Sequence, residues 1–104
     1  MTNAFIVCCT CANAVEAKQI ATTLVEERLA ACANIFPSIC SIYRWEGKVE
    51  SAEEWLLFIK SAEPHFPKLR DRITELHSYD TPEIIALPIV AGSEKYLSWL
   101  RDQL

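Results

Sequence analysis

Two long segments rich in β-branched and aromatic residues flank a single glycine near the middle of this chain. Residues 30–45 form the first arm and residues 48–60 the second, with Glu46 and Gly47 between them. Glycine tolerates the positive φ that a two-residue hairpin turn requires, so the pattern predicts one long β-hairpin. Arms of about fifteen residues, at about 3.3 Å per residue, would give a ribbon about 45–50 Å long.

The predicted ribbon is longer than the body that carries it. A compact domain of this length has a radius of gyration of about 13 Å, so part of the ribbon must project. The projecting part carries Ile42, Tyr43, Trp45 and Val49 in place of a uniformly polar surface. These side chains need a partner surface, and another copy of the same chain would supply it. We therefore expect an obligate oligomer.

The second arm gives a separate reason to expect an oligomer. In an extended strand Trp55, Leu57 and Ile59 face one side, whereas Leu56 and Phe58 face the other. A single layer of helices covers only one face of a sheet. We therefore expect subunits that pack sheet to sheet.

The elements before and within the hairpin follow from local patterns. Residues 4–10 are apolar without alternation, which is typical of a central strand covered on both faces. Asn13 and Glu16 resemble a capping box at the start of a helix. Pro37 cannot donate a hydrogen bond to a neighbouring strand, so it predicts a bulge or an edge position in the first arm.

The elements after the hairpin complete a known architecture. We expect a helix that starts at Pro64 or Pro67 and runs to His77, a strand at residues 83–91 that Pro88 places at an edge, and a short helix capped by Ser93. The order β-α-β-β-α-β plus a terminal helix predicts an α+β, ferredoxin-like sandwich with strand order 4-1-3-2. Residues 1–104 would form a single domain.

Composition excludes several classes of function. The net charge of −4 comes without a basic block, so nucleic acid and anionic membranes are not expected partners. Two glycines are too few for a phosphate-binding loop after the first strand. The five cysteines do not form an even set, and most fall in predicted buried strands, which favours free thiols in a reducing cytoplasm. No apolar run approaches about 20 residues, and the N-terminus lacks the pattern of a signal peptide.

Catalytic chemistry is weakly represented, and we expect that the protein is not an enzyme. The loop after the first strand has no arginine for an acylphosphatase-like site, and the third strand lacks the basic and aromatic motif of RNA-recognition domains. The histidines are His65 and His77. A nucleophilic pair of Cys9 with His77 is conceivable, but no oxyanion hole is evident.

A metal site is the more open possibility. Cys9 and Cys11 share one face of the first strand and Cys8 faces the other, so at most two of these thiols converge. Thiolate together with the imidazole of His77 suits copper or zinc rather than magnesium or calcium. The alternative is structural: Cys8 is a small core residue, Cys9 and Cys11 are thiols at a strand end, and His77 is a polar helix end.

Several segments, in one order along nearly the whole chain, resemble the CutA family of divalent-cation tolerance proteins. They are residues 29–34 (LAACAN), 41–48 (SIYRWEGK), 60–61 (KS), 77–84 (HSYDTPEI) and 96–99 (YLSW). The resemblance implies a homotrimer similar to the PII signalling proteins, and a role in tolerance to copper and other divalent metals. It also implies that copper(II), or another divalent transition metal, binds without any organic cofactor.

The resemblance further implies which residues would bind the metal. The ligands proposed in copper-binding members correspond here to Cys9, His77 and Glu83. The chain departs from the family pattern at Leu76, where some members have a second histidine, and at Ser78, where proline is usual.

Two functions therefore remain. The first is a cytoplasmic homotrimer that binds divalent metal and contributes to metal tolerance. The alternative is a PII-like sensor or scaffold that binds a small molecule or a protein partner at inter-subunit clefts, near Lys60 and Tyr79.

Overall fold

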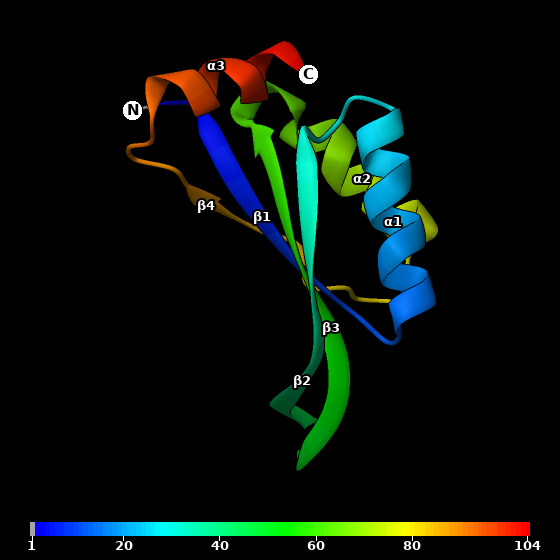
Figure 1. Ribbon diagram of the computed structural model, residues 1–104. Coiled ribbons are helices and arrows are strands. Elements are labelled where there is room, and N and C mark those ends of the chain that lie inside the picture. The colour runs from blue at the N-terminus through cyan, green and yellow to red at the C-terminus, as the bar shows by residue number, and fades with distance from the viewer. Residues whose placement is uncertain (1) are drawn as a thin grey trace.

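The computed structural model describes residues 2–104 as a four-stranded antiparallel sheet with three α-helices (Figure 1). The elements in order are β1 (Ala4–Cys11), α1 (Ala14–Glu26), β2 (Cys32–Trp45), β3 (Lys48–Ala62), a 3-10 turn (Glu63–His65), α2 (Phe66–Leu76), β4 (Ile85–Pro88) and α3 (Glu94–Asp102). The strands lie in the order β2-β3-β1-β4. This order, read from the other edge, is 4-1-3-2, so the predicted ferredoxin-like α+β fold is confirmed.

The hairpin of β2 and β3 is the longest feature of the molecule. Glu46 and Gly47 both have positive φ, 48° and 78°, as a two-residue turn of this kind requires. The predicted irregularity at Pro37 is a register shift between Phe36 and Ile39. Pairing with β1 extends only over residues 55–62 of β3, so residues 48–54 pair with β2 alone. This distal part projects below the body in Figure 1.

The main core lies between one face of the sheet and helices α1 and α2. Cys9, Leu57 and Ile59 face this core and are fully buried, together with Ile20 of α1 and Leu69 of α2. The opposite face of the sheet is less well covered, since Leu56 and Phe58 stay partly exposed. The predicted alternation along β3 is therefore confirmed.

Helix α3 covers a second, smaller cluster at the end of the sheet away from the hairpin tip. Leu97 and Leu100 pack there against Ala4 and Ala31. Ser93 caps the helix as predicted, since its side chain accepts a hydrogen bond from the Tyr96 N–H at 3.2 Å. Within residues 2–104, no helix has the length and apolar character needed to cross a membrane.

The last strand is shorter than the sequence predicts. Residues 83–91 were expected to be extended, but β4 covers only Ile85–Pro88. Pairing with β1 is limited to four positions, from Cys8–Ile85 to Phe5–Pro88. The Ile89 N–H still donates to the Ala4 carbonyl oxygen at 2.9 Å, but β1 begins at Ala4, so the last strand has no partner strand beyond this point. The predicted edge position of this strand is confirmed.

Candidate functional site

Two cysteines of β1 and one histidine after α2 come together beneath the helices. The possible ligand atoms of Cys9, Cys11 and His77 all lie within 4.8 Å of one another. Alternation along β1 places both thiols on the helix-facing side, and the end of α2 places His77 over them. Ligand atoms around one tetrahedral zinc lie about 3.3–3.8 Å apart, so this thiol–imidazole cluster has nearly the size of a single ion site.

The imidazole of His77 is fixed by a hydrogen bond at each ring nitrogen. Its side chain is 0% exposed. Nδ1 accepts a hydrogen bond from the Tyr79 N–H at 3.0 Å, and Nε2 lies 2.8 Å from the carbonyl oxygen of Thr10. A peptide N–H can only donate and a carbonyl can only accept, so these partners place a proton on Nε2 and a lone pair on Nδ1. A metal ion that binds this ring must replace one of these two partners.

Glu16 holds the loop that carries His77. Its carboxylate accepts hydrogen bonds from the Ser78 N–H at 3.0 Å and the Ala12 N–H at 3.4 Å, and it lies 3.8 Å from Nδ1 of His77. Burial raises the pKa of Glu16. The hydrogen bonds from Ser78 and Ala12, together with the nearby His77, lower it by more than burial raises it, so the pKa is lowered overall. The carboxylate therefore stays ionised beside the cluster.

The thiol of Cys9 is protonated at neutral pH. The pKa of Cys9 is raised by its hydrogen-bonding contact with Cys11, then by burial, and also by the negative charges of Glu83 and Glu16. On the other face of β1, burial and Glu83 raise the pKa of Cys8. Metals bind the thiolate form, so an ion at this cluster must displace protons.

The donor set fits a soft transition metal. Two sulfurs and one imidazole nitrogen are ligands typical of copper and zinc. The hydrogen bond from Nε2 to the Thr10 carbonyl is of the kind that orients a metal-bound histidine through its other ring nitrogen. The residues present therefore fit a metal ion, on condition that the ring gives up one hydrogen bond and the thiols lose protons.

The structure places the three predicted ligands in two different environments. Cys9 and His77 lie in the cluster, as the sequence predicted, and Cys11 joins them. Cys11 was absent from the predicted ligand set, although the alternation of β1 already placed it on the same face as Cys9. Glu83 is exposed and is not a member of the cluster among the described residues. It lines a cavity next to it.

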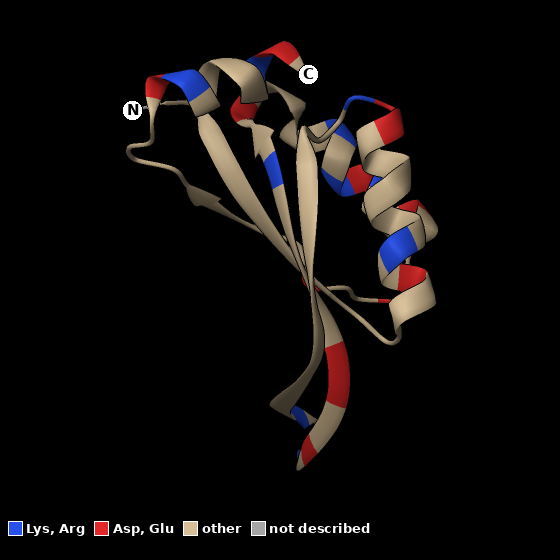
Figure 2. Cartoon of the chain, viewed as in Figure 1, with Lys and Arg blue, Asp and Glu red and all other residues tan. Residues whose placement is uncertain are grey.

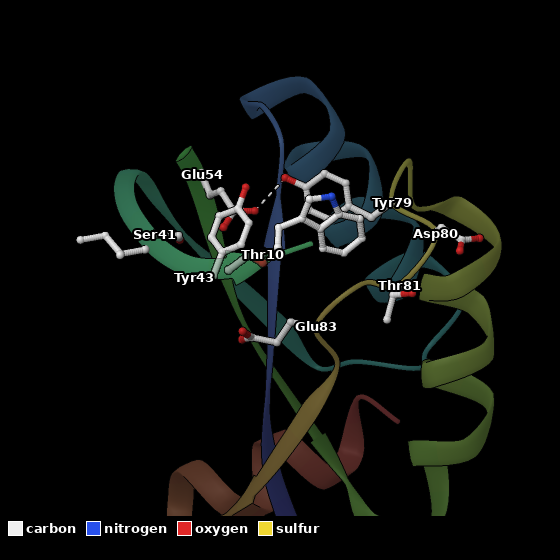
Figure 3. Close-up of a pocket in the computed structure, with 10 residues that line it drawn as sticks. Thr10, Ser41, Tyr43, Glu54, Tyr79, Asp80, Thr81 and Glu83 are labelled. Carbon is white, nitrogen blue, oxygen red and sulfur yellow. Dashed lines mark hydrogen bonds between the residues drawn. The ribbon is translucent and has the colours of Figure 1, made fainter. Parts of the chain in front are cut away.

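This cavity, of about 700 Å³, lies between the hairpin and the segment after α2 (Figure 3). Glu54 of β3 is 7% exposed, and its carboxylate accepts a hydrogen bond of 2.7 Å from the hydroxyl of Tyr79, drawn as the dashed line. Burial, and then this hydrogen bond, raise the pKa of Tyr79, so the phenol remains a donor. The lining residues are Thr10, Ser41, Ile42, Tyr43, Trp45, Glu54, Tyr79, Asp80, Thr81 and Glu83.

Of the two residues that the sequence placed near a ligand cleft, one lines this cavity. Tyr79 forms part of its wall. Lys60 lies elsewhere: its Nζ donates to Asn34 Oδ1 at 2.8 Å and lies 5.9 Å from the ring centre of Tyr96.

The fold and the site define a class: a ferredoxin-like α+β protein with a projecting hairpin and a thiol–imidazole cluster that fits a soft metal ion. A family model described as CutA1 divalent ion tolerance protein matches residues 5–103. The chain belongs to this family.

The relatives agree with this assignment. The chain is 55% identical, over 86 residues, to the divalent-cation tolerance protein CutA of Thermus thermophilus, which covers 83% of this chain and 84% of that protein. It is 47% identical over 97 residues to the chloroplastic protein CutA of Arabidopsis thaliana, which covers 93% of this chain but 53% of that protein. The chain thus spans about half the length of this plant relative.

A solved structure confirms the fold. The divalent cation tolerance protein (Cut A1) from Thermus thermophilus superposes with a TM-score of 0.94 at 49% sequence identity. The superposition covers 96% of this chain and 97% of that one.

Proposed function

We propose that this protein is a cytoplasmic, PII-like homotrimer that binds a divalent transition metal and contributes to metal tolerance without acting as an enzyme. Copper(II) is the first candidate ion and zinc the second. The observation that carries the proposal is the convergence of Cys9, Cys11 and His77 within 4.8 Å. Family membership supports the role in metal tolerance.

The burial of the cluster suits sequestration. Cys9 and Cys11 are 0% exposed, so a bound ion would be shielded from water and from other cellular thiols. Soft sulfur ligands favour copper and zinc over the abundant magnesium and calcium ions. Glu83, as a fourth ligand, remains a prediction, because its exposed carboxylate would have to reach the ion from the adjoining cavity.

The test is a metal titration of the reduced protein under anaerobic conditions. Cobalt(II) serves as a coloured stand-in for zinc, and copper(II) is titrated separately. We expect thiolate-to-cobalt absorption in the wild type and its loss in the double variant Cys9→Ser, His77→Ala. Cys40→Ser is the matched control, since Cys40 is an exposed free thiol on β2. Equal and negligible binding by wild type and double variant would refute the metal site.

A separate variant tests the part played by Cys11. Cys11→Ser should weaken cobalt binding and reduce the intensity of the thiolate absorption, because one of two sulfur ligands is lost. If Cys11→Ser binds cobalt with unchanged affinity and absorption, Cys11 is not a ligand.

The trimer is supported by the distribution of exposed apolar residues. The projecting part of the hairpin and the open face of the sheet expose a set of large hydrophobic side chains: Ile42, Tyr43, Trp45, Val49, Ile85 and Leu87. Sedimentation equilibrium should give about 35 kDa, three times the chain mass of 11.8 kDa. A stable species of 11.8 kDa at micromolar concentration would contradict this part of the proposal.

The cytoplasmic location is supported by the cysteines. All five are free, and three of them are buried. Free thiols persist in a reducing compartment. Cell fractionation with a marker enzyme for each compartment tests the location.

A small-molecule sensor is the second candidate function. The cavity beside Glu54 favours it, because its volume lies within the range of about 300–1,000 Å³ found for small-molecule sites.

A further inference from the structure

Glu54 is a buried acid without a cationic partner. Its residue is 7% exposed, and its hydrogen-bond partner is the neutral hydroxyl of Tyr79. None of the ion pairs among residues 2–104 involves Glu54. A buried carboxylate is costly unless a positive charge or several donors compensate it. One neutral donor leaves most of this cost in place.

The walls around Glu54 suit a positively charged guest. Tyr43, Trp45 and Tyr79 supply three aromatic rings, whose faces attract cations. Figure 3 shows Tyr43 and Tyr79 beside the Glu54 carboxylate. Asp80 and Glu83 add negative charge to the lining.

The charge of the lining has one sign. Among the described residues that form it, none is lysine, arginine or histidine. Figure 2 shows acidic residues on β3 where the projecting part of the hairpin begins. An anionic or nucleotide-like guest would therefore meet repulsion from three carboxylates.

We propose that this cavity binds a small organic cation whose ammonium or guanidinium group pairs with Glu54 between the rings of Tyr43, Trp45 and Tyr79. The inference rests on the second candidate function and gives its ligand class. Charge-assisted hydrogen bonds to Glu54 and cation–π contacts would together supply the affinity.

The same residues are poorly arranged for a metal ion. Hard divalent ions need several oxygen ligands that converge on one point. Within residues 2–104, the carboxylates of Glu54, Asp80 and Glu83 do not form a group whose oxygens lie within 4.8 Å of one another. A guest that spreads its charge over a larger volume matches such separated acids better than a bare ion.

The experiment is isothermal titration calorimetry of the assembled protein at low ionic strength, in the presence of a chelator. Choline and agmatine are the probes. 3,3-Dimethylbutan-1-ol is the neutral isostere of choline, and glutarate is the anionic control. We expect both cations to bind and the two controls to bind at least about tenfold more weakly.

Glu54→Gln and Glu53→Gln form a matched pair of variants. They remove one negative charge from neighbouring positions of β3, but Glu53 is exposed, bonds to Ser38 and lies outside the cavity lining. Glu54→Gln should weaken cation binding by at least about tenfold, while Glu53→Gln stays within about twofold of wild type. Equal effects of the two changes would mean that only net charge matters, which overturns the proposed site.

A second variant keeps the test decisive if Glu54→Gln fails to fold. Trp45 is 58% exposed in the single chain, so the fold should tolerate Trp45→Leu, and sedimentation velocity checks that the variant still assembles. It should weaken choline binding more than binding of the neutral isostere. No binding of either cation, or equal binding of choline and its isostere, would overturn the inference.

The metal proposal can fail separately. The Cys11→Ser variant, which should weaken cobalt binding, should still bind choline, because Cys11 lies outside the cavity lining. A protein that binds neither cation yet retains cobalt loses only this inference and the sensor function. The opposite result removes only the metal site.

Discussion

At the scale of single residues, Glu16 connects two elements far apart in sequence. Its carboxylate joins the N–H of Ala12, before α1, to the N–H of Ser78, after α2. The sequence predicted that Glu16 would reach back at the start of the helix. The bond to Ser78 could not be predicted, because nothing local indicates that residue 78 folds over residue 16.

Glu16→Gln should destabilise the protein in a pH-dependent way. The pKa of Glu16 is lower in the folded chain than its usual value of about 4.3, so its stabilisation is full above that value and is lost as the pH falls through the folded pKa. We expect a loss of about 1–2 kcal/mol at pH 7, since charge-assisted hydrogen bonds are weakened, and a smaller loss near pH 3.5.

Urea denaturation at the two pH values measures this difference. Glu26→Gln, an exposed acid on the same helix, is the control and should change the free energy of unfolding little at either pH. A loss from Glu16→Gln that grows on acidification would contradict the assignment.

Proton release should make metal affinity depend on pH. Because the pKa of Cys9 is raised, an ion that binds this sulfur must displace a proton across the neutral range. The apparent affinity for cobalt should therefore rise by about tenfold per pH unit for each proton released. Titrations at pH 6.5 and 7.5 test this, and an affinity independent of pH would argue against thiolate ligation.

At the scale of elements, the long hairpin was the most predictable feature. Gly47 fixed the turn, the composition of the arms indicated strands, and Pro37 marked the bulge. These signals are local, so the sequence displays them directly. The predicted extent of the last strand was wrong. Its length depends on how far β1 can pair with it, which is a tertiary property.

Gly47→Ala tests the turn. A Cβ at this position meets no atom within 4 Å, so the cost arises from the φ of 78° alone. We expect a loss of about 1 kcal/mol in the free energy of unfolding. Gly47→Asn should cost less, because asparagine accepts positive φ more readily. Equal losses for alanine and asparagine, measured by urea denaturation, would contradict this explanation.

The candidate site was predicted in part. Alternation along β1 gave the shared face of Cys9 and Cys11, and His77 was recognised as the partner. The adjoining cavity was not predictable, since its walls come from β1, the hairpin and residues 79–83. Only the folded chain shows that Glu54 and Tyr79, which are 25 positions apart, form a hydrogen bond.

At the scale of the whole molecule, some exposed hydrophobic residues cluster on the projecting hairpin, whereas Val15 lies on the helical side of the sheet. Val49 on the projecting hairpin is 66% exposed and has Trp45 and Ile42 nearby in the same ribbon. Val15 on α1 is 78% exposed, on the helical side of the sheet. The proposed trimer would cover Val49 and leave Val15 exposed to water.

Val49→Glu and Val15→Glu therefore make a matched test of the trimer. A charge buried at an interface is costly, so Val49→Glu should weaken association by at least about tenfold. Val15→Glu should leave it unchanged. Sedimentation velocity over a dilution series measures both, and equal behaviour of the two variants would place the interface elsewhere.

The distal half of the hairpin has one further consequence. Residues 48–54 of β3 pair with β2 alone, so this part of the hairpin is a two-stranded ribbon with no third strand beside it. In a dissociated chain, the amide protons of this ribbon should exchange with deuterium faster than those of β1. Assembly should slow that exchange. The deuterium uptake of a peptide that contains residues 48–54 would therefore report the fraction of associated subunits at each dilution.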